Sequence, residues 1–417
     1  MKTIMIKKRI LIHSLVFSPD GVSTAYLFND IALALKNEGF DVIVLSTTPH
    51  FNVVQEQLSE QPIKWGIWGL YKKSHFCGIP VYHVPQKKFR STALRILGFL
   101  YWHIISFFIG LSIKNVDVIV SPSPPLTIGL LNVILGKLKK CKVIYNVQEI
   151  YPDILNTPET SIITRILRRM ERKVYNESSA VTTIDQVFYN TIIERFNDKS
   201  KLHIIPNFVD TSLYHSGVSQ QKLDKNIFPD NDNIKLLYAG NIGLAQDWEP
   251  LIKLAVKTRD LPLEYFVIGM GAKKQWLQEQ KEALLLDKLH IIDYQPRKLM
   301  PAILAYSDLQ FIFMTPESDG MGFPSKVYTI MACARPLLVC SGANSPIVRF
   351  LQPIGCAKLI TEYDVDQKTD EMAKWLGSTT REQLIEMGNK GLDIIRKHYT
   401  KEIVTQQYVE LIQSITK

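Results

Sequence analysis

Short apolar runs alternate with amphipathic stretches along the first half of the chain. The apolar runs predict strands, and the stretches between them, such as 23–40 with Gly39 near its end, predict helices. The predicted strands fall at residues 9–17, 41–46, 81–84, 117–125, 142–150, 180–184 and 204–210. Residues 47–79 show no clear period before 81–84 and are predicted to be irregular. Strands alternating with helices of this length predict a parallel sheet covered by helices.

The same alternation restarts in the second half, after a stretch rich in Asp, Asn, Ser and Gln. Predicted strands there are 234–240, 263–269, 289–294, 309–314 and 336–340, and helices at 380–397 and 401–415 close the chain. A chain of 417 residues is too long for one core, so two α/β, doubly wound (Rossmann-like) domains are expected. The predicted division is 1–210, a linker 211–233, 234–395, and a C-terminal helix at 396–417 whose return to the first domain stays open.

Positive charge is concentrated in the first half. Residues 1–190 contain 22 Lys and Arg against 13 Asp and Glu, whereas the remainder contains 27 of each, so the net charge of +9 arises entirely there. Such asymmetry predicts that this half faces something anionic, either nucleic acid or a phospholipid surface. No helix-turn-helix or stacking platform supports nucleic acid. The N-terminal sequence lacks a small-residue cleavage site, so we expect no secretory signal.

The apolar run 97–113 allows three interpretations. With 17 residues it is short for a bilayer span, which needs about 20. It could be a buried helix, or a helix lying in the membrane interface with Tyr101 and Trp102 as anchors. The cations that precede it, and that would contact anionic lipid, are Lys87, Lys88, Arg90 and Arg95.

A metal or disulfide site is not expected. The five cysteines are scattered without a C-x-x-C pair, which argues for a reducing compartment. Two Asp-x-Asp pairs occur, at 230–232 and 364–366, but neither follows a predicted strand, and Asp364 is placed to cap a helix. The protein is therefore expected to need no metal cofactor.

Three turns in the second half carry candidate chemistry. Gly240, Asn241 and Gly243 follow one predicted strand directly, and Gly269 and Gly271 follow the next. Glycine lets the backbone approach a ligand closely, and helix starts offer N–H groups to anions. In the third turn, "GMGFPSKVY", Pro324 suits a first helical position and Ser325 and Lys326 follow. A cation at a helix start is unfavourable unless an anion such as a pyrophosphate faces both.

Four motifs carry a family resemblance. "YNVQEIYPDIL", "IPNFVD", "YAGNIGLAQDW" and "GFPSKVYTIMACARPLLV", in this order, resemble the GT-B glycosyltransferases of family 4. The resemblance covers essentially the whole chain and is strongest to the bacterial branch that transfers sugars such as N-acetyl-fucosamine in O-antigen or capsule assembly. It implies two domains facing a cleft, a nucleotide-sugar donor in the C-terminal domain, an acceptor in the N-terminal domain, and metal-independent transfer with retention.

The resemblance also implies residue roles. Ser325 and Lys326 would hold the donor phosphates, with Tyr328 near the ribose. Gly240 and Asn241, with Gly269 and Gly271 in the neighbouring turn, would face the pyrophosphate, and Tyr294 and Gln295 would flank the base. Asp20 and Gly21 would cap the phosphates from the first domain. We expect the donor to be a UDP-sugar and the acceptor a polyprenyl-diphosphate-linked saccharide.

The chain departs from the family where two glutamates eight positions apart are common. Those positions fall near Met321 and Thr329, with Glu317 and Asp319 close but off register, and Asn241 and Gln246 replace a frequent Arg and Lys. Lys326 would then be the principal phosphate cation.

In "NVQEIYPDIL" we expect Gln148 and Glu149 to reach the acceptor, with Glu149 positioning its hydroxyl or acting as base, and with Asp153 competing for the role. Glu149 could instead cap the next helix. A carboxylate nucleophile would need a second carboxylate about 5 Å away, and no such pair is evident.

The expected protein is a glycosyltransferase at the inner face of the bacterial cytoplasmic membrane. Two alternatives stay open. One is a UDP-sugar 2-epimerase, which has the same architecture but needs no lipid acceptor. The other is a nucleotide-sugar-binding subunit without catalysis that docks at the membrane.

Overall fold

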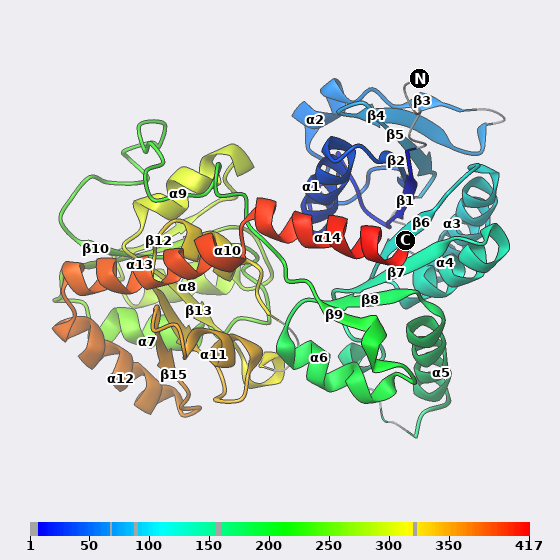
Figure 1. Ribbon diagram of the computed structural model, residues 1–417. Helices are drawn as coiled ribbons and strands as arrows, with labels where there is room; N and C mark the ends of the chain where they lie inside the picture. Colours follow the sequence, from blue (N-terminus) through cyan, green and yellow to red (C-terminus); the bar gives the residue numbers. More distant parts are fainter. Residues whose placement is uncertain (1–6, 67–68, 87–90, 156–157, 159, 320–322) are drawn as a thin grey trace. The chain divides into compact units, whose positions relative to one another are not determined.

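The computed structural model describes residues 7–66, 69–86, 91–155, 158, 160–319 and 323–417. The chain divides into two compact units, the first formed by residues 1–207 with 402–417 and the second by residues 208–401 (Figure 1). Lys87, Lys88, Arg90 and Met321, which the sequence analysis singled out, lie outside the described residues.

The first unit is built on a nine-stranded sheet in the order β3-β4-β5-β2-β1-β6-β7-β8-β9. Pairing is parallel except at β4, which is antiparallel to both β3 and β5. The strands are β1 (Arg9–His13), β2 (Asp41–Thr47), β3 (Lys64–Trp65), β4 (Lys72–Phe76), β5 (Ile79–Val84), β6 (Val118–Pro122), β7 (Lys142–Val147), β8 (Ala180–Thr183) and β9 (Leu202–Ile204). The helices are α1 (Ser23–Asn37), α2 (Gln55–Glu60), α3 (Thr92–Ser112), α4 (Leu126–Lys139), α5 (Ile162–Glu177), α6 (Gln186–Ile192) and α14 (Lys401–Ile415).

Two expectations for this unit are wrong. Residues 47–79 are not irregular, because they hold α2, β3 and β4. β4 (KKSHF) exposes Lys73 and His75 and buries Ser74, so it lacks the apolar alternation that marks a strand. The strand expected at 204–210 is β9, which ends at Ile204, while the following residues run as loop with one bridge between Val209 and Thr400.

The second unit contains a six-stranded parallel sheet in the order β12-β11-β10-β13-β14-β15. Its strands are β10 (Ile234–Ala239), β11 (Leu263–Ile268), β12 (Leu289–Ile292), β13 (Leu309–Phe313), β14 (Leu337–Cys340) and β15 (Ala357–Ile360). Its helices are α7 (Glu249–Lys257), α8 (Lys274–Ala283), α9 (Met300–Tyr306), α10 (Lys326–Ala332), α11 (Pro346–Leu351), α12 (Val365–Ser378) and α13 (Arg381–His398). The predicted linker 211–233 belongs to this unit and buries Leu223 and Phe228 against β11 and α9.

The parallel part of each sheet reverses its strand order once. The first does so between β1 and β6, and the second between β10 and β13. In doubly wound sheets ligands bind beyond the carboxyl ends of the strands at such a reversal. The predicted doubly wound α/β class is therefore confirmed for each unit, and each unit has one edge where a ligand is expected.

The apolar run of the sequence analysis forms part of α3, and it is not a buried helix. Only Trp102, Ser106, Ile109 and Gly110 of α3 are buried, and they pack toward the sheet. The opposite face is apolar yet exposed. By length and composition α3 could cross a membrane, and it is the only such helix among the described residues.

Candidate functional site

Two of the three predicted glycine-bearing turns, those of Gly240 and of Gly269, meet at the carboxyl edge of the second unit's sheet, while residues 320–322 of the third lie outside the described residues. Gly240, Gly269 and Gly271 have φ of +152°, +147° and +157°, values that side-chain-bearing residues rarely adopt. A Cβ on Gly269 would lie 1.9 Å from the Gly240 carbonyl oxygen, and one on Gly271 would lie 2.2 Å from the Ile242 oxygen. Glycine is therefore required for the turns to pack against each other, and their predicted convergence is confirmed.

Lys326 links the two strands between which the strand order reverses, β10 and β13. It follows β13 in the chain, yet its Nζ donates to the carbonyl oxygen of Ala239, the last residue of β10, at 3.2 Å. The same Nζ lies 3.9 Å from the centre of the Tyr238 ring, and a Cβ on Gly240 would approach it to 2.7 Å. The ammonium thus lies at the point where the fold favours a ligand.

The electrostatic setting of Lys326 suits an anion. No carboxylate pairs with it in the described part of the chain. Desolvation lowers the pKa of its ammonium to about 7, because burial disfavours the charged form. A diphosphate in front of Nζ would restore a charge partner and reverse that shift.

Tyr238 is a site residue that the sequence analysis missed. Its hydroxyl donates to the Asn241 carbonyl oxygen at 2.8 Å, and its ring packs edge-on against Trp248 with centroids 5.0 Å apart. One side chain therefore holds the turn and supports the lysine through a cation–π contact. Its position as the last aromatic of a strand before a glycine was the only signal in the sequence.

Most of the other residues predicted to bind the nucleotide-sugar are accessible to solvent. Ser325, Asn241 and Tyr294 are exposed and Gln295 is half-buried, and Tyr294 and Gln295 follow β12 at the same edge of the sheet. Gln295 donates to the Asp293 carbonyl oxygen at 3.2 Å, which leaves its amide at the surface. Roles for these residues in holding phosphates or base stay predictions.

Tyr328 does not lie where the expected ribose contact requires. Only 4% of its surface is exposed, and its ring packs against Phe323, Phe350 and Tyr399, with centroids 5.1–5.9 Å apart. Two residues after Lys326, the turn of α10 directs it inward. We therefore correct the ribose role.

The Asp319 carboxylate is also engaged in hydrogen bonds within the second unit. Its carboxylate accepts hydrogen bonds from the Ser341 hydroxyl, the Gly342 N–H at 2.7 Å and the Tyr363 hydroxyl at 2.9 Å. These contacts tie together the turns that follow β13, β14 and β15. The Asp-x-Asp pair at 364–366 is a helix cap, as predicted, with Asp364 accepting from the N–H groups of Asp366 and Gln367.

In the first unit, Gln148 ends a buried amide network. Its Nε2 donates to Asn146 Oδ1 at 2.8 Å, and Asn207 Nδ2 donates to its Oε1 at 2.9 Å. Asn146 in turn donates to Thr182 and to Tyr408 of α14, at 2.9 and 3.0 Å. Gln148 therefore shapes the loop after β7 and links it to the C-terminal helix.

Glu149 is half-buried beside Gln148 and hydrogen-bonds to the Tyr151 hydroxyl. Burial raises the pKa of its carboxyl, and the Tyr151 bond opposes that rise. A raised pKa suits a group that accepts a proton near neutral pH. Its place after β7 keeps Glu149 the leading candidate to contact an acceptor.

Asp153 lies in a structural ion-pair cluster. It pairs with Arg168 at 2.7 Å and with Arg195 at 2.6 Å. Both arginines also pair with Glu171, which is fully buried. Both oxygens of this carboxylate are therefore engaged by guanidinium groups of its own unit, so we correct the catalytic role considered for Asp153.

Asp20 and Gly21 are likewise engaged within their own unit. Asp20 is buried, and its Oδ1 accepts from the N–H groups of His50 and Phe51, both at 2.8 Å. The Gly21 N–H donates to the Phe51 carbonyl oxygen, and a Cβ on Gly21 would lie 2.4 Å from the Asn52 oxygen. They join the turns after β1 and β2, so the role of capping phosphates is corrected.

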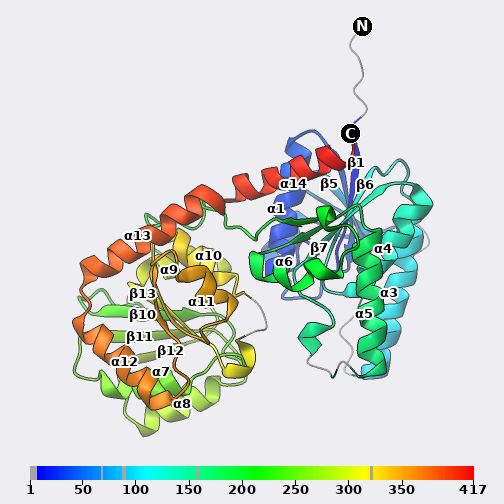
Figure 2. The ribbon, with the colours of Figure 1, turned by 60° about the horizontal axis from the view of Figure 1, so that its bottom comes forward.

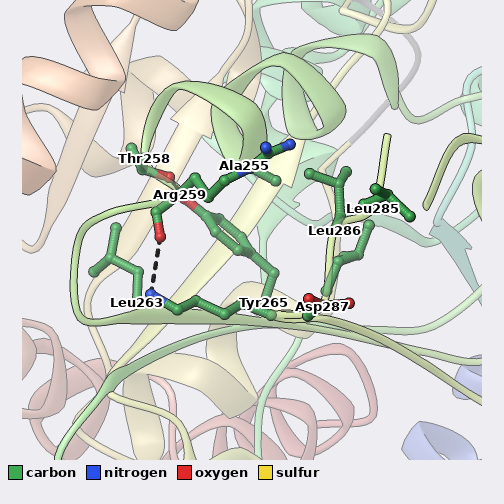
Figure 3. A pocket seen from close by; sticks show the side chains of 10 residues that line it. Ala255, Thr258, Arg259, Leu263, Tyr265, Leu285, Leu286 and Asp287 are labelled. Atoms are coloured by element: carbon green, nitrogen blue, oxygen red, sulfur yellow. Dashed lines mark hydrogen bonds between the residues drawn. The ribbon is translucent and has the colours of Figure 1, made fainter. Parts of the chain in front are cut away.

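A hollow elsewhere in the second unit is not a competing site. It lies at the amino ends of β11 and β12, opposite to the glycine turns, and is lined by Thr258, Tyr265 and Leu286 among others (Figure 3). Lys288 Nζ donates across it to the Arg259 carbonyl oxygen at 2.9 Å. These polar groups are satisfied locally, and none faces Lys326.

Comparisons with known proteins agree with this geometry. The family model described as Glycosyltransferase Family 4 matches residues 24–213, and the model described as Glycosyl transferases group 1 matches residues 219–391. WcaI of Escherichia coli K12, named as a glycosyl transferase of colanic acid biosynthesis, is 23% identical and covers 78% of this chain and 81% of its own. WbjE of Pseudomonas aeruginosa, named as a glycosyltransferase, is 21% identical over 72% of this chain and 75% of its own.

Solved structures show the same fold. HepE of Anabaena, solved in complex with UDP, has a TM-score of 0.71 and 14% identity, covering 98% of this chain and all of its own. Sucrose-phosphate synthase of Thermosynechococcus elongatus has a TM-score of 0.71 and 12% identity, covering 98% and 99%. These matches favour transfer over the epimerase and the non-catalytic subunit. The chain is therefore a glycosyltransferase with the GT-B fold, in which residues 24–213 match the family 4 model and residues 219–391 match the group 1 model.

Proposed function

We propose that the protein transfers a sugar, with retention and without a metal, from a UDP-sugar to a polyprenyl-diphosphate-linked saccharide in surface polysaccharide assembly. The observation that carries the donor half is Lys326. Its ammonium lies without a carboxylate partner, within the described residues, at the strand-order reversal beside Gly240. The UDP bound to HepE and the biosynthetic role in the name of WcaI support the proposal.

Lys326 would stabilise the departing diphosphate. Negative charge grows on that group as the sugar bond breaks, and a preplaced ammonium in a desolvated setting interacts with it strongly. The glycine turns would allow the phosphates to approach the backbone, and Ser325 and Asn241 would contact them from the exposed rim. Tyr294 and Gln295 would flank the base.

Glu149 would orient the acceptor hydroxyl or accept its proton. Its raised pKa and its position after β7 support that role, while the amide network at Gln148 keeps the loop in place. Most of the rate enhancement would then come from positioning and charge stabilisation. The particular sugar, such as the N-acetyl-fucosamine of the resembling branch, depends on the shape of the donor pocket.

A lipid-linked acceptor requires the enzyme to work at the cytoplasmic face of the membrane. We include in the proposal that α3 lies in the membrane interface. Its outer face exposes Leu97, Leu100, Tyr101, Ile104 and Phe108, and Arg95 lies at its start. An apolar face with flanking cations is typical of helices that bind anionic bilayers.

Thermal unfolding with nucleotides tests the donor site. UDP at about 100 times its dissociation constant should stabilise the fold by roughly 2.7 kcal/mol, whereas GDP, ADP and CMP should not. Lys326→Met keeps most of the side-chain volume but removes the charge, and at the same UDP concentration it should lower the stabilisation to about 1.4 kcal/mol or less. Lys374→Met, an exposed lysine on α12, is the matched control and should respond like the wild type. An equal response of Lys326→Met to UDP would contradict the proposed site.

A further inference from the structure

The start of α5 exposes apolar side chains that the enzyme chemistry does not use. Ile162, Ile163 and Ile166 are 68%, 65% and 52% exposed. Single exposed apolar residues are ordinary, but three within five residues form a patch that water disfavours. In the sequence, the arginines around this segment mask its apolar run.

The start of α3 has the same character. Every residue from Thr92 to Leu97 is exposed, including Leu94, Ile96 and Leu97. These two turns therefore make little contact with the rest of the unit on any side, which is unusual for so apolar a segment. Stability of the fold does not explain why they are apolar.

α4 packs against both α3 and α5, and the starts of these two helices extend beyond the start of α4 (Figure 2). His103 of α3 hydrogen-bonds to Thr127, the second residue of α4, at 2.9 Å. The residues of α3 from Thr92 to Trp102 therefore lie beyond the start of α4. At a rise of about 1.5 Å per residue they extend roughly 15 Å past it. Val174 of α5 contacts Gly129 near the start of α4, so Ile162 to Ile166 also lie beyond it.

The direction of this projection is fixed by the sheet. The three helices precede or follow parallel strands β6, β7 and β8, so each helix begins at the carboxyl edge. That edge also carries the loop after β7 with Glu149. The apolar helix starts and the candidate acceptor residue therefore belong to the same end of the first unit.

Among the described residues, the exposed charges at the starts of α3 and α5 are positive, while Glu159, which precedes α5 in the sequence, lies outside them. Arg95, Arg165 and Arg169 are exposed there, and residues 92–116 contain no Asp or Glu. The two acidic residues of α5 are neutralised, because Glu171 is buried between two arginines and Glu177 pairs with Lys137 at 2.9 Å. Apolar tips with exposed arginines complement an anionic phospholipid surface.

We propose that α5 is a second membrane-inserting element, and that the starts of α3 and α5 together enter one leaflet of an anionic bilayer. This inference deepens the proposed function, because a bilayer held at the carboxyl edge of the first unit would deliver a lipid-linked acceptor to the loop of Glu149. If α3 alone were inserted, the first unit could rotate about the axis of that helix relative to the bilayer. Two separated tips fix which edge faces the lipid.

Vesicle co-sedimentation of the full chain tests the role of α5. The triple variant Ile162→Ser, Ile163→Ser, Ile166→Ser should bind vesicles of mixed phosphatidylglycerol and phosphatidylethanolamine at least about tenfold more weakly than the wild type. The matched control is Leu285→Ser with Ile385→Ser, which removes exposed apolar side chains from the second unit and should bind as the wild type does. Arg165→Gln with Arg169→Gln should lose affinity for anionic vesicles and little for phosphatidylcholine.

UDP affinity, measured on every variant, separates this inference from the donor proposal. The α5 variants should bind UDP as the wild type does, because Ile162 to Ile166 lie in the first unit. Vesicle binding by the triple variant equal to that of the wild type would overturn the role of α5, whatever the UDP result. Failure of the wild type to bind vesicles would overturn it too, and would point to a protein partner for these surfaces. Failure of UDP binding alone would contradict only the donor site.

Discussion

The unusual pKa of Lys326 makes a quantitative prediction about donor binding. Desolvation places the pKa of the free ammonium at about 7, and a bound diphosphate would raise it by supplying a counter-charge. Protonation and UDP binding are then linked, since the complex holds the proton more tightly than the free protein does. Affinity should be greatest below pH 7 and should fall as the pH rises above it.

The size of the effect follows from the fraction of protein that carries the proton. With a pKa of about 7, that fraction is about one tenth at pH 8 and decreases about tenfold for each further pH unit, so the UDP dissociation constant should rise roughly hundredfold between pH 7.5 and 9.5. The rise stops where the pH reaches the pKa of the complex. The second phosphate ionisation, with a pKa of about 6, is complete over this range and does not contribute.

Calorimetric titration of UDP at several pH values measures this dependence. At pH 8, titrations in buffers of different ionisation enthalpy should also report uptake of nearly one proton per UDP bound. Lys326→Arg is the control, because a guanidinium stays charged throughout and should give an affinity that hardly changes with pH. A wild-type dissociation constant that stays within about threefold from pH 7.5 to 9.5 would refute the linkage.

Two further predictions concern the architecture of the sites. Gly240→Ala should weaken UDP binding at least about tenfold, because the new Cβ would lie 2.7 Å from Lys326 Nζ and because alanine rarely adopts a φ of +152°. In the same titration, Gly217→Ala is the control and should leave the affinity unchanged, since the nearest atom to its Cβ would be 3.5 Å away. Asp153→Asn should lower the free energy of unfolding by about 1 kcal/mol in urea while transfer continues, whereas Glu149→Gln should reduce transfer and leave the urea midpoint nearly unchanged. A stable but inactive Asp153→Asn would restore the catalytic role that the ion pairs contradict.

The fold was largely predictable because each strand of the two parallel cores is a short apolar run. β10, β11 and β13 appear within one residue of their predicted ends. β4 was missed because its buried position is Ser74 and its exposed positions are polar, so no apolar alternation appears, and β15 (AKLI) is too short to show a period. Exposure of α3 could not be predicted, since composition alone does not separate a buried apolar helix from one that faces lipid.

Predictability of the site depended on whether the signal was local. Gly240 and Gly269 follow their strands directly, and Lys326 begins the helix that comes after β13, so the topology brings all three to one edge. Asp153 and Asp20 were misjudged because their partners lie 15 or more residues away in sequence, at Arg168, Arg195, His50 and Phe51. Burial of Tyr328 followed from helix phase, which depends on where α10 begins.

The most direct test of the donor site is the UDP affinity of the wild type, Lys326→Met and Lys374→Met at pH 7. The account predicts that the wild type and Lys374→Met bind alike, and that Lys326→Met binds at least about tenfold more weakly, as expected for loss of a hydrogen bond to a charged group. Equal affinity for Lys326→Met, or no UDP binding by the wild type, would contradict the claim that this lysine holds the donor diphosphate.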